Sequence, residues 1–101
     1  MHVQGRVGGG LAVTVRGDLD YLTARQFLEC IDRSLQPPPA DLHVDLQLVT
    51  FLDSSGIGAL VTARKRAERV GTRLILEHPT PAVYRTLETA ALVGYLGLSR
   101  S

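Results

Sequence analysis

VTFLDSSGIGALVTARKRAERVG, residues 49–71, contains the transition that decides the fold of this chain. An apolar segment ends at Leu52, and Asp53, Ser54 and Ser55 follow at once, all residue types that favour the N-cap of a helix. A helical pattern then runs to Gly71, where a glycine favours a left-handed C-cap. The stretch therefore predicts a buried strand, an abrupt polar turn and a helix.

The start of this helix has the features of an anion site. We expect Ser54 at the N-cap and Ser55 one residue inside, with Gly56 and Gly58 leaving the backbone of the first turn open to close approach. Unpaired N–H groups at the positive end of a helix dipole suit a phosphate. A simple helix cap is the competing interpretation, but two hydroxyls and two glycines exceed what capping needs.

Two apolar patterns precede this stretch. Residues 3–7 and 11–16 predict a β-hairpin around the glycines at positions 8–10, and residues 17–20 break the second strand. A helix is expected from Thr23, with Gln26 at capping-box spacing, to the prolines at 37–39. Alternating apolar residues from 42 to 48 predict the strand that leads into the central stretch.

The chain after Gly71 predicts one more strand and one more helix. Residues 74–76 are continuously apolar, as in a strand buried on both faces. Thr80 and Pro81 predict a helix start, and residues 92–98 a last short edge element, either a closing strand or a turn. The expected inward faces are Ile57, Leu60, Val61, Ala63, Ala67 and Val70 on the central helix and Val83, Leu87, Ala90 and Ala91 on the last. Strands alternating with helices predict a single α/β domain, residues 1–101, with a mostly parallel sheet.

Composition excludes several classes of function. A net charge of +1 over 101 residues argues against a nucleic-acid binder driven by bulk charge. No apolar run approaches the roughly 18 residues of a membrane span, so we expect no membrane segment and a cytoplasmic protein. The single cysteine, Cys30, cannot form an internal disulfide and is expected as a small core residue.

The sequence offers no catalytic or cofactor motif. It contains neither a G-x-S-x-G elbow nor a phosphate-binding glycine loop, and its histidines, His2, His43 and His78, are scattered without metal-ligand spacing. We therefore expect a protein that is not an enzyme, with no catalytic residue, no metal and no cofactor.

Four segments of the chain together resemble the STAS family, and within it the stand-alone anti-anti-sigma factors (anti-sigma factor antagonists) of bacteria. These segments are GDLDYLTA at residues 17–24, VDLQLVTFLDSSGIGAL at 44–60, the glycine at 71 followed by LIL, and PTPAVYRTLE at 79–88. The resemblance implies a STAS fold, a mixed four- to five-stranded sheet with helices packed on one side.

The resemblance also implies a function. In this family the serine directly after the aspartate is phosphorylated by an ATP-using anti-sigma factor serine kinase, and a separate PP2C-type phosphatase reverses the reaction. Carried over, the phosphoacceptor is Ser54, with Asp53, Ser55, Gly56 and Gly58 supporting the site. ATP and Mg²⁺ would belong to the kinase, and the phosphate would weaken partner binding by charge alone.

The partner surface is expected beside this turn. Loops at one edge of a parallel sheet meet, which should bring Asp18 and Asp20 near Ser54, with Ile57 on the second helix. A turn that merely starts the first helix is the other interpretation of the two aspartates. Two other roles stay open: a STAS subunit docked on a membrane transporter or lipid-trafficking ATPase, and a scaffold in a stress-signalling complex. An intact DSSG turn favours the switch, because a permanent dock needs no phosphoacceptor.

Overall fold

The computed structural model describes residues 1–6 and 10–98 of the chain. Within these residues the elements follow in the order β1 (His2–Gly5), β2 (Leu11–Leu19), α1 (Ala24–Ser34), β3 (Asp41–Leu52), α2 (Ser54–Arg69), β4 (Arg73–Glu77) and α3 (Pro81–Thr89). This is the alternation predicted from the sequence patterns.

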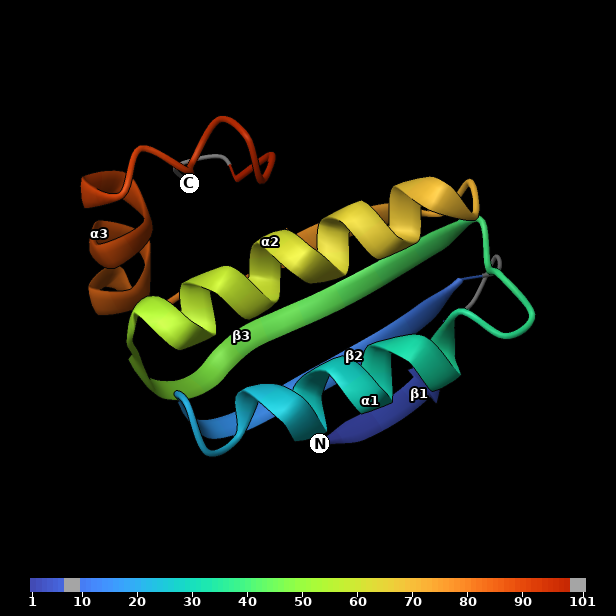
Figure 1. Cartoon of the computed structure of the whole chain (residues 1–101), viewed down its shortest axis with the longest axis horizontal. Helices are drawn as coiled ribbons and strands as arrows, with labels where there is room; N and C mark the ends of the chain where they lie inside the picture. Colours follow the sequence, from blue (N-terminus) through green and yellow to red (C-terminus); the bar gives the residue numbers. More distant parts are fainter. Residues whose placement is uncertain (7–9, 99–101) are drawn as a thin grey trace.

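The strands form one four-stranded mixed sheet in the order β1-β2-β3-β4. β1 pairs antiparallel with β2, whereas β2–β3 and β3–β4 are parallel pairs. Because each right-handed crossover steps to the next strand in the same direction, α1 and α2 lie on the same face of the sheet (Figure 1). α3 lies beyond the end at which β3 finishes (Figure 1). The predicted sheet with helices on one side is confirmed.

The core lies between this sheet and the helices. Its fully buried large side chains are Val13, Val15, Leu19, Phe27, Ile31, Leu42, Val44, Leu46, Leu60, Leu87 and Leu96. Cys30 is buried on α1, as predicted. α2 lays small residues on the sheet, and its buried positions are Gly56, Ala59, Leu60, Ala63 and Ala67. The expected inward position of Val70 is wrong, since it follows the last helical residue and is 44% exposed.

The end of α2 follows the prediction closely. Gly71 has a φ of 78°, in the left-handed region that favours glycine. Its N–H donates to the carbonyl of Glu68 at 3.1 Å, and the N–H of Thr72 donates to that of Ala67 at 2.9 Å. This pair of bonds is a Schellman motif, which satisfies the last carbonyls of the helix and directs the chain into β4.

The N-terminal half differs from expectation at two places. β2 continues through residues 17–19, because register shifts near Gly17, whose φ is 85°, keep the strand paired with β3. The capping box at Thr23 is wrong, since its side chain makes no cap bond and its Oγ1 instead donates to the carbonyl of Asp18 at 2.7 Å. Most of the expected hairpin turn, residues 7–9, lies outside the described residues.

The C-terminal third also differs from expectation. Residues 92–98 form turns, the second of the two expected alternatives, and Leu96 and Leu98 are buried. Among the described strands β4 therefore lies at an edge of the sheet, and Ile75 is only half-buried on the face without helices. Thr80 caps α3 as predicted, accepting a bond from the Val83 N–H at 3.2 Å. The predicted inner residues Ala90 and Ala91 are wrong, because the helix ends at Thr89 and both are exposed.

Candidate functional site: the start of α2

Asp53 is the N-cap of α2. Its Oδ1 accepts a hydrogen bond from the Gly56 N–H at 2.9 Å, and its carbonyl accepts one from the Ile57 N–H at 2.9 Å. The expectation that Ser54 caps the helix is therefore wrong by one residue. Asp53 is the N-cap because its backbone is extended, with φ −104° and ψ −173°. Its carboxylate can therefore accept hydrogen bonds from the first turn.

Ser54 and Ser55 are the first two residues of the helix, and they face different surroundings. Ser54 is exposed, whereas Ser55 is half-buried. Ser55 lines a groove between α1 and α2, together with Leu28 and Arg66. Neither serine N–H has a hydrogen-bond acceptor within residues 1–6 and 10–98. The helix start therefore offers two free N–H groups and one hydroxyl that is open to solvent.

The two glycines of this helix have opposite roles. A Cβ built on Gly56 would lie 2.0 Å from the carbonyl oxygen of Leu19 and 2.7 Å from Cδ1 of Leu52. Gly56 therefore lets the start of α2 pack directly on the end of β2. A Cβ on Gly58 would meet nothing within 4 Å. We expected both glycines to let another chain approach the first turn. Of the two, only Gly58 can do so, because the backbone at Gly56 is already covered by β2.

Asp18, near the end of β2, and Asp20, just after it, lie at the same edge of the sheet as Ser54, as predicted. Asp18 pairs in register with Phe51, and Leu19 with Leu52. Asp18 is exposed, and its Oδ1 accepts a bond from the Thr50 hydroxyl at 2.8 Å. Asp20 is held in the turn instead.

The carboxylate of Asp20 organises the β2–α1 connection. Its Oδ1 accepts bonds from the N–H groups of Leu22 at 2.9 Å and Thr23 at 3.1 Å. This is an Asx turn, which fixes the entry to α1. The simpler interpretation, a turn that starts the helix, therefore applies to Asp20, whereas Asp18 stays available for a partner.

Three exposed apolar side chains that sequence reasoning did not assign lie at the same edge. Tyr21 is 77% exposed, Leu22 79% and Phe51 52%. Tyr21 and Leu22 could have been found from the sequence, because two neighbouring apolar residues are unusual in a loop between a strand and a helix. We call Asp18, Tyr21, Leu22, Phe51 and Ser54 the turn surface.

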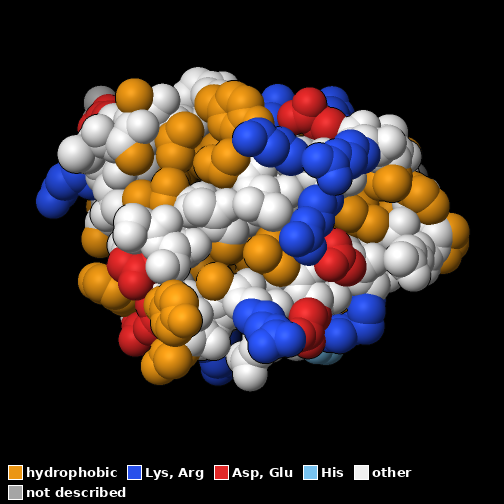
Figure 2. All heavy atoms as spheres, viewed as in Figure 1, with side chains coloured by type: hydrophobic (Ala, Val, Ile, Leu, Met, Phe, Trp, Pro, Cys, Tyr) orange, Lys and Arg blue, Asp and Glu red, His pale blue; other side chains and the backbone are white. Residues whose placement is uncertain are grey.

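Charge is divided unequally between the two ends of α2. Acidic and apolar atoms lie together where β2 and β3 end, and Lys and Arg atoms run over the second half of the helix (Figure 2). The first group contains Asp18, Asp20 and Asp53; the second contains Arg64, Lys65, Arg66 and Arg69. A further anionic group at Ser54 would therefore add to a charge of the same sign.

Ile57 joins the site to α3. Its side chain is half-buried and packs partly against the core. It also lines a shallow hollow with Ala82, Arg85 and Thr86 of α3. The predicted partner residue thus lies between two helices, where part of its side chain stays accessible.

No helix in the described parts of the chain has the length and apolar character needed to cross a bilayer.

The family model of the STAS domain matches residues 1–101. Two curated relatives are Anti-sigma F factor antagonists. That of Paenibacillus polymyxa is 29% identical over 86 residues, covering 83% of this chain and 73% of the relative. That of Lysinibacillus sphaericus is 27% identical over 95 residues, covering 91% and 81%.

Solved structures share the fold. An anti-sigma factor antagonist from Mycobacterium paratuberculosis superimposes with a TM-score of 0.82 at 24% identity, covering 99% of this chain and 84% of that one. A sulfate transporter family protein from Wolinella succinogenes gives 0.79 at 20% identity, covering 93% and 75%. The Bacillus cell fate determinant SpoIIAA in its phosphorylated form gives 0.70 at 20% identity, covering 99% and 91%. The same architecture thus occurs both in an anti-sigma factor antagonist and in a sulfate transporter family protein.

Proposed function

This chain belongs to the STAS domain family, and we propose that it is an anti-sigma factor antagonist switched off by phosphorylation of Ser54. In this role it binds an anti-sigma factor that is also a serine kinase, and so frees an alternative sigma factor for transcription. A PP2C-type phosphatase restores the active form. The protein is a substrate and not an enzyme, and ATP and Mg²⁺ are held by the kinase.

The observation that carries this proposal is the exposed hydroxyl of Ser54 on the first turn of a capped helix, within a surface of acidic and apolar side chains. Two curated relatives are Anti-sigma F factor antagonists, which supports the same role. The phosphorylated form of SpoIIAA shares the fold, which supports the idea that this architecture tolerates a phosphate.

The mechanism follows from the charges at the helix start. Asp53 already occupies the capping position with its carboxylate, so a phosphate on Ser54 cannot replace it there. The phosphate adds about −1.5 to −2 charges beside that carboxylate. Free N–H groups of Ser54 and Ser55 offset part of the cost within the folded domain. The domain therefore accepts the group without refolding.

The same charge acts strongly across an interface. Two unit charges about 4 Å apart interact by about 4 kcal/mol at an effective dielectric constant near 20. A hundredfold loss of affinity requires only about 2.8 kcal/mol. Repulsion from partner acids, together with desolvation of the phosphate, is thus sufficient for the switch.

The test uses the purified domain, the anti-sigma factor kinases of the same organism, ATP and mass spectrometry. We expect one phosphopeptide, modified at Ser54. Ser54→Ala should abolish labelling and keep partner binding, whereas Ser54→Glu should weaken binding at an unchanged melting temperature. Ser55→Ala is the matched control and should still be labelled. A phosphate found on Ser55 alone would contradict the assignment.

The same variants separate a second role. The likeness to a sulfate transporter family protein makes a permanent dock on a transporter the alternative. A permanent dock does not depend on a phosphoacceptor, so its affinity would be the same for wild type, Ser54→Ala and phosphorylated protein. Binding to an anti-sigma factor that falls on phosphorylation would exclude it.

A further inference from the structure

β4 has a free edge with unsatisfied backbone groups. The Arg73 N–H donates to the carbonyl of Ala40, on the side of β3. Since backbone groups alternate along a strand, those of Leu74 and Leu76 point away from β3. In the described part of the chain, no backbone hydrogen bond satisfies them from that side. An apolar edge of this kind is a template for pairing with another strand.

The C-terminal segment as far as Leu98, the last described residue, does not cover this edge with its backbone. The N–H groups of Leu96 and Leu98 donate to the carbonyls of Leu92 and Val93, within the same segment. A groove of about 570 Å³ opens beside β4, lined by Ile75 and Glu77 on one side and by Tyr84 and Leu98 on the other. The edge is therefore accessible to another chain.

The sequence of β4 is complementary to itself. It reads Arg73-Leu-Ile75-Leu-Glu77, with a cation at one end and an anion at the other. In an antiparallel pair of two copies centred on Ile75, Arg73 of one copy lies opposite the partner's Glu77, and the reverse. Leu74 lies opposite the partner's Leu76 as a hydrogen-bonded pair, which uses the free backbone groups. Arg73 and the partner's Glu77 form a non-hydrogen-bonded pair, in which side chains are closer.

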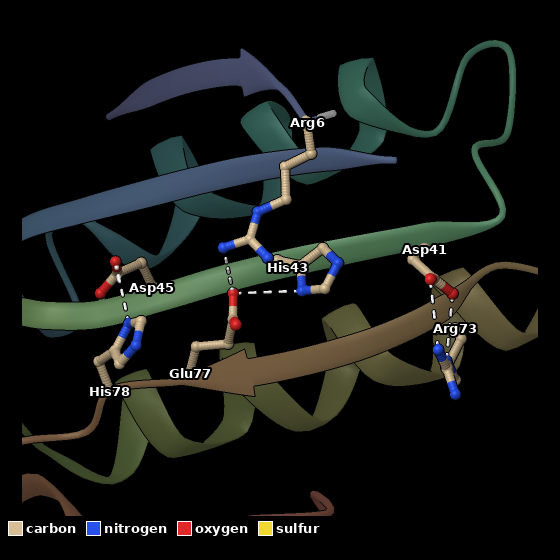
Figure 3. A network of polar contacts seen from close by, with 7 residues as sticks. All are labelled: Arg6, Asp41, His43, Asp45, Arg73, Glu77 and His78. Atoms are coloured by element: carbon tan, nitrogen blue, oxygen red, sulfur yellow. Dashed lines mark hydrogen bonds and ion pairs between the residues drawn. The ribbon is translucent and has the colours of Figure 1, made fainter. Parts of the chain in front are cut away.

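Arg73 and Glu77, at the two ends of β4, already form ion pairs within one copy (Figure 3). Each of these ion pairs could continue into the second copy of such a pair. Both lie on the sheet face without helices, where Arg73 contacts Asp41 at 3.1 Å and Glu77 contacts Arg6 at 2.8 Å. The Arg73 side chain is still 73% exposed, so it can contact a second carboxylate. The order across the pair would be Asp41, Arg73, then the partner's Glu77 and the partner's Arg6, with alternating signs throughout.

We propose that two copies of this chain form a symmetric dimer by antiparallel pairing of β4 with β4. The occupant is a second copy because a two-fold axis places these opposite charges face to face at both ends at once. The contact uses the side edge of the sheet, whereas Ser54 lies beyond the end of β3. Both copies of the turn surface thus remain open in the dimer.

The test exchanges the charges at the two ends of β4 and measures dimerisation of the whole chain by sedimentation velocity. The concentration runs from about 10 µM to about 1 mM, because a short edge contact predicts a weak dimer. Arg73→Glu and Glu77→Arg each place like charges opposite one another. Each should weaken the dimer at least about tenfold. The Arg73→Glu/Glu77→Arg double variant restores opposite charges across the pair and should recover part of the affinity, since the exchange also removes the ion pairs with Asp41 and Arg6.

A mixture of the two single variants gives the sharpest control. Neither should self-associate, but together they place opposite charges at both ends and should form a heterodimer. This result also excludes a folding defect in either variant. A wild type that stays monomeric throughout, single variants that dimerise like wild type, or a mixture that stays monomeric would overturn the proposal.

Hydrogen exchange identifies the competing occupant. Pairing of two copies predicts that the amides of Leu74 and Leu76 become protected as concentration rises. Protection that is already complete in the monomer would mean that the chain's own C-terminal segment fills the edge, and would also overturn the proposal.

Discussion

Gly56→Ala should destabilise this domain severely, although the change adds one methyl group. The new Cβ would lie 2.0 Å from the Leu19 carbonyl oxygen, whereas contacts of real Cβ atoms are longer than 3.0 Å. The start of α2 must therefore move by about 1 Å. The atom in the way belongs to the backbone of a paired strand, so it cannot move aside as a flexible side chain would.

The expected magnitude follows from three contributions. Overpacking at such a contact costs about 1–3 kcal/mol. Displacement of the first turn weakens the bond between the Gly56 N–H and Asp53, a cap worth about 1 kcal/mol. The better helix propensity of alanine returns about 0.5–1 kcal/mol. The net loss is about 1–3.5 kcal/mol, or about 4–28 °C in melting temperature for a domain of this size.

Gly58→Ala is the matched control, because its Cβ meets nothing within 4 Å. It should stabilise the domain by about 0.5–1 kcal/mol. Urea denaturation of both variants measures the two free energies of unfolding. A Gly56→Ala protein within about 0.5 kcal/mol of wild type would refute the packing argument, because the closest contact of α2 with β2 would then carry no cost.

Three further predictions concern the polar groups around the site. Asp20→Ala should cost about 1 kcal/mol, since it removes the acceptor of the Asx turn, whereas Asp18→Ala should leave the melting temperature unchanged and weaken partner binding in calorimetry; equal melting temperatures would remove the distinction between them. Asp53→Asn should keep the stability of wild type in urea denaturation, because asparagine caps equally well, and Asp53→Ala should lose about 1 kcal/mol; an Asn variant as unstable as the Ala variant would mean that charge, not capping, dominates. Thr80→Ala should lower the free energy of unfolding by about 1 kcal/mol through loss of the α3 cap, and an unchanged denaturation midpoint would contradict this.

The features that local chemistry determines could be predicted from the sequence. The glycine at position 71 and the Thr80-Pro81 pair each fix a helix end within a few residues, and the structure has both ends where they are expected. The alternation of strands and helices likewise fixes the handedness and the face on which α1 and α2 lie. The neighbourhood of Asp18 and Ser54 follows from this topology.

The remaining features depend on competition between neighbours in space. Asp53 and Ser54 are both good N-caps, and the extended backbone after β3 decides in favour of the aspartate. Thr23 could cap α1, but Asp20 and the carbonyl of Asp18 engage its side chain first. The role of Gly56 could not be predicted, because it depends on the position of the Leu19 carbonyl, which is distant in sequence. Such choices depend on the tertiary structure, and a sequence pattern cannot predict them.

The contact between Gly56 and the Leu19 carbonyl also bears on biosynthesis. It joins the end of β2 to the start of α2, so neither strand–helix unit contains the site on its own. In the proposed role, a nascent chain that has not yet paired β3 with β2 would therefore offer the kinase an ordinary flexible serine without the surface around it. The pool of antagonist that the proposed role requires would then be the number of folded copies rather than the number of copies made. A mutation that slows folding would thus act in the cell as a reduced dose of the regulator, even where every residue of the turn surface is intact.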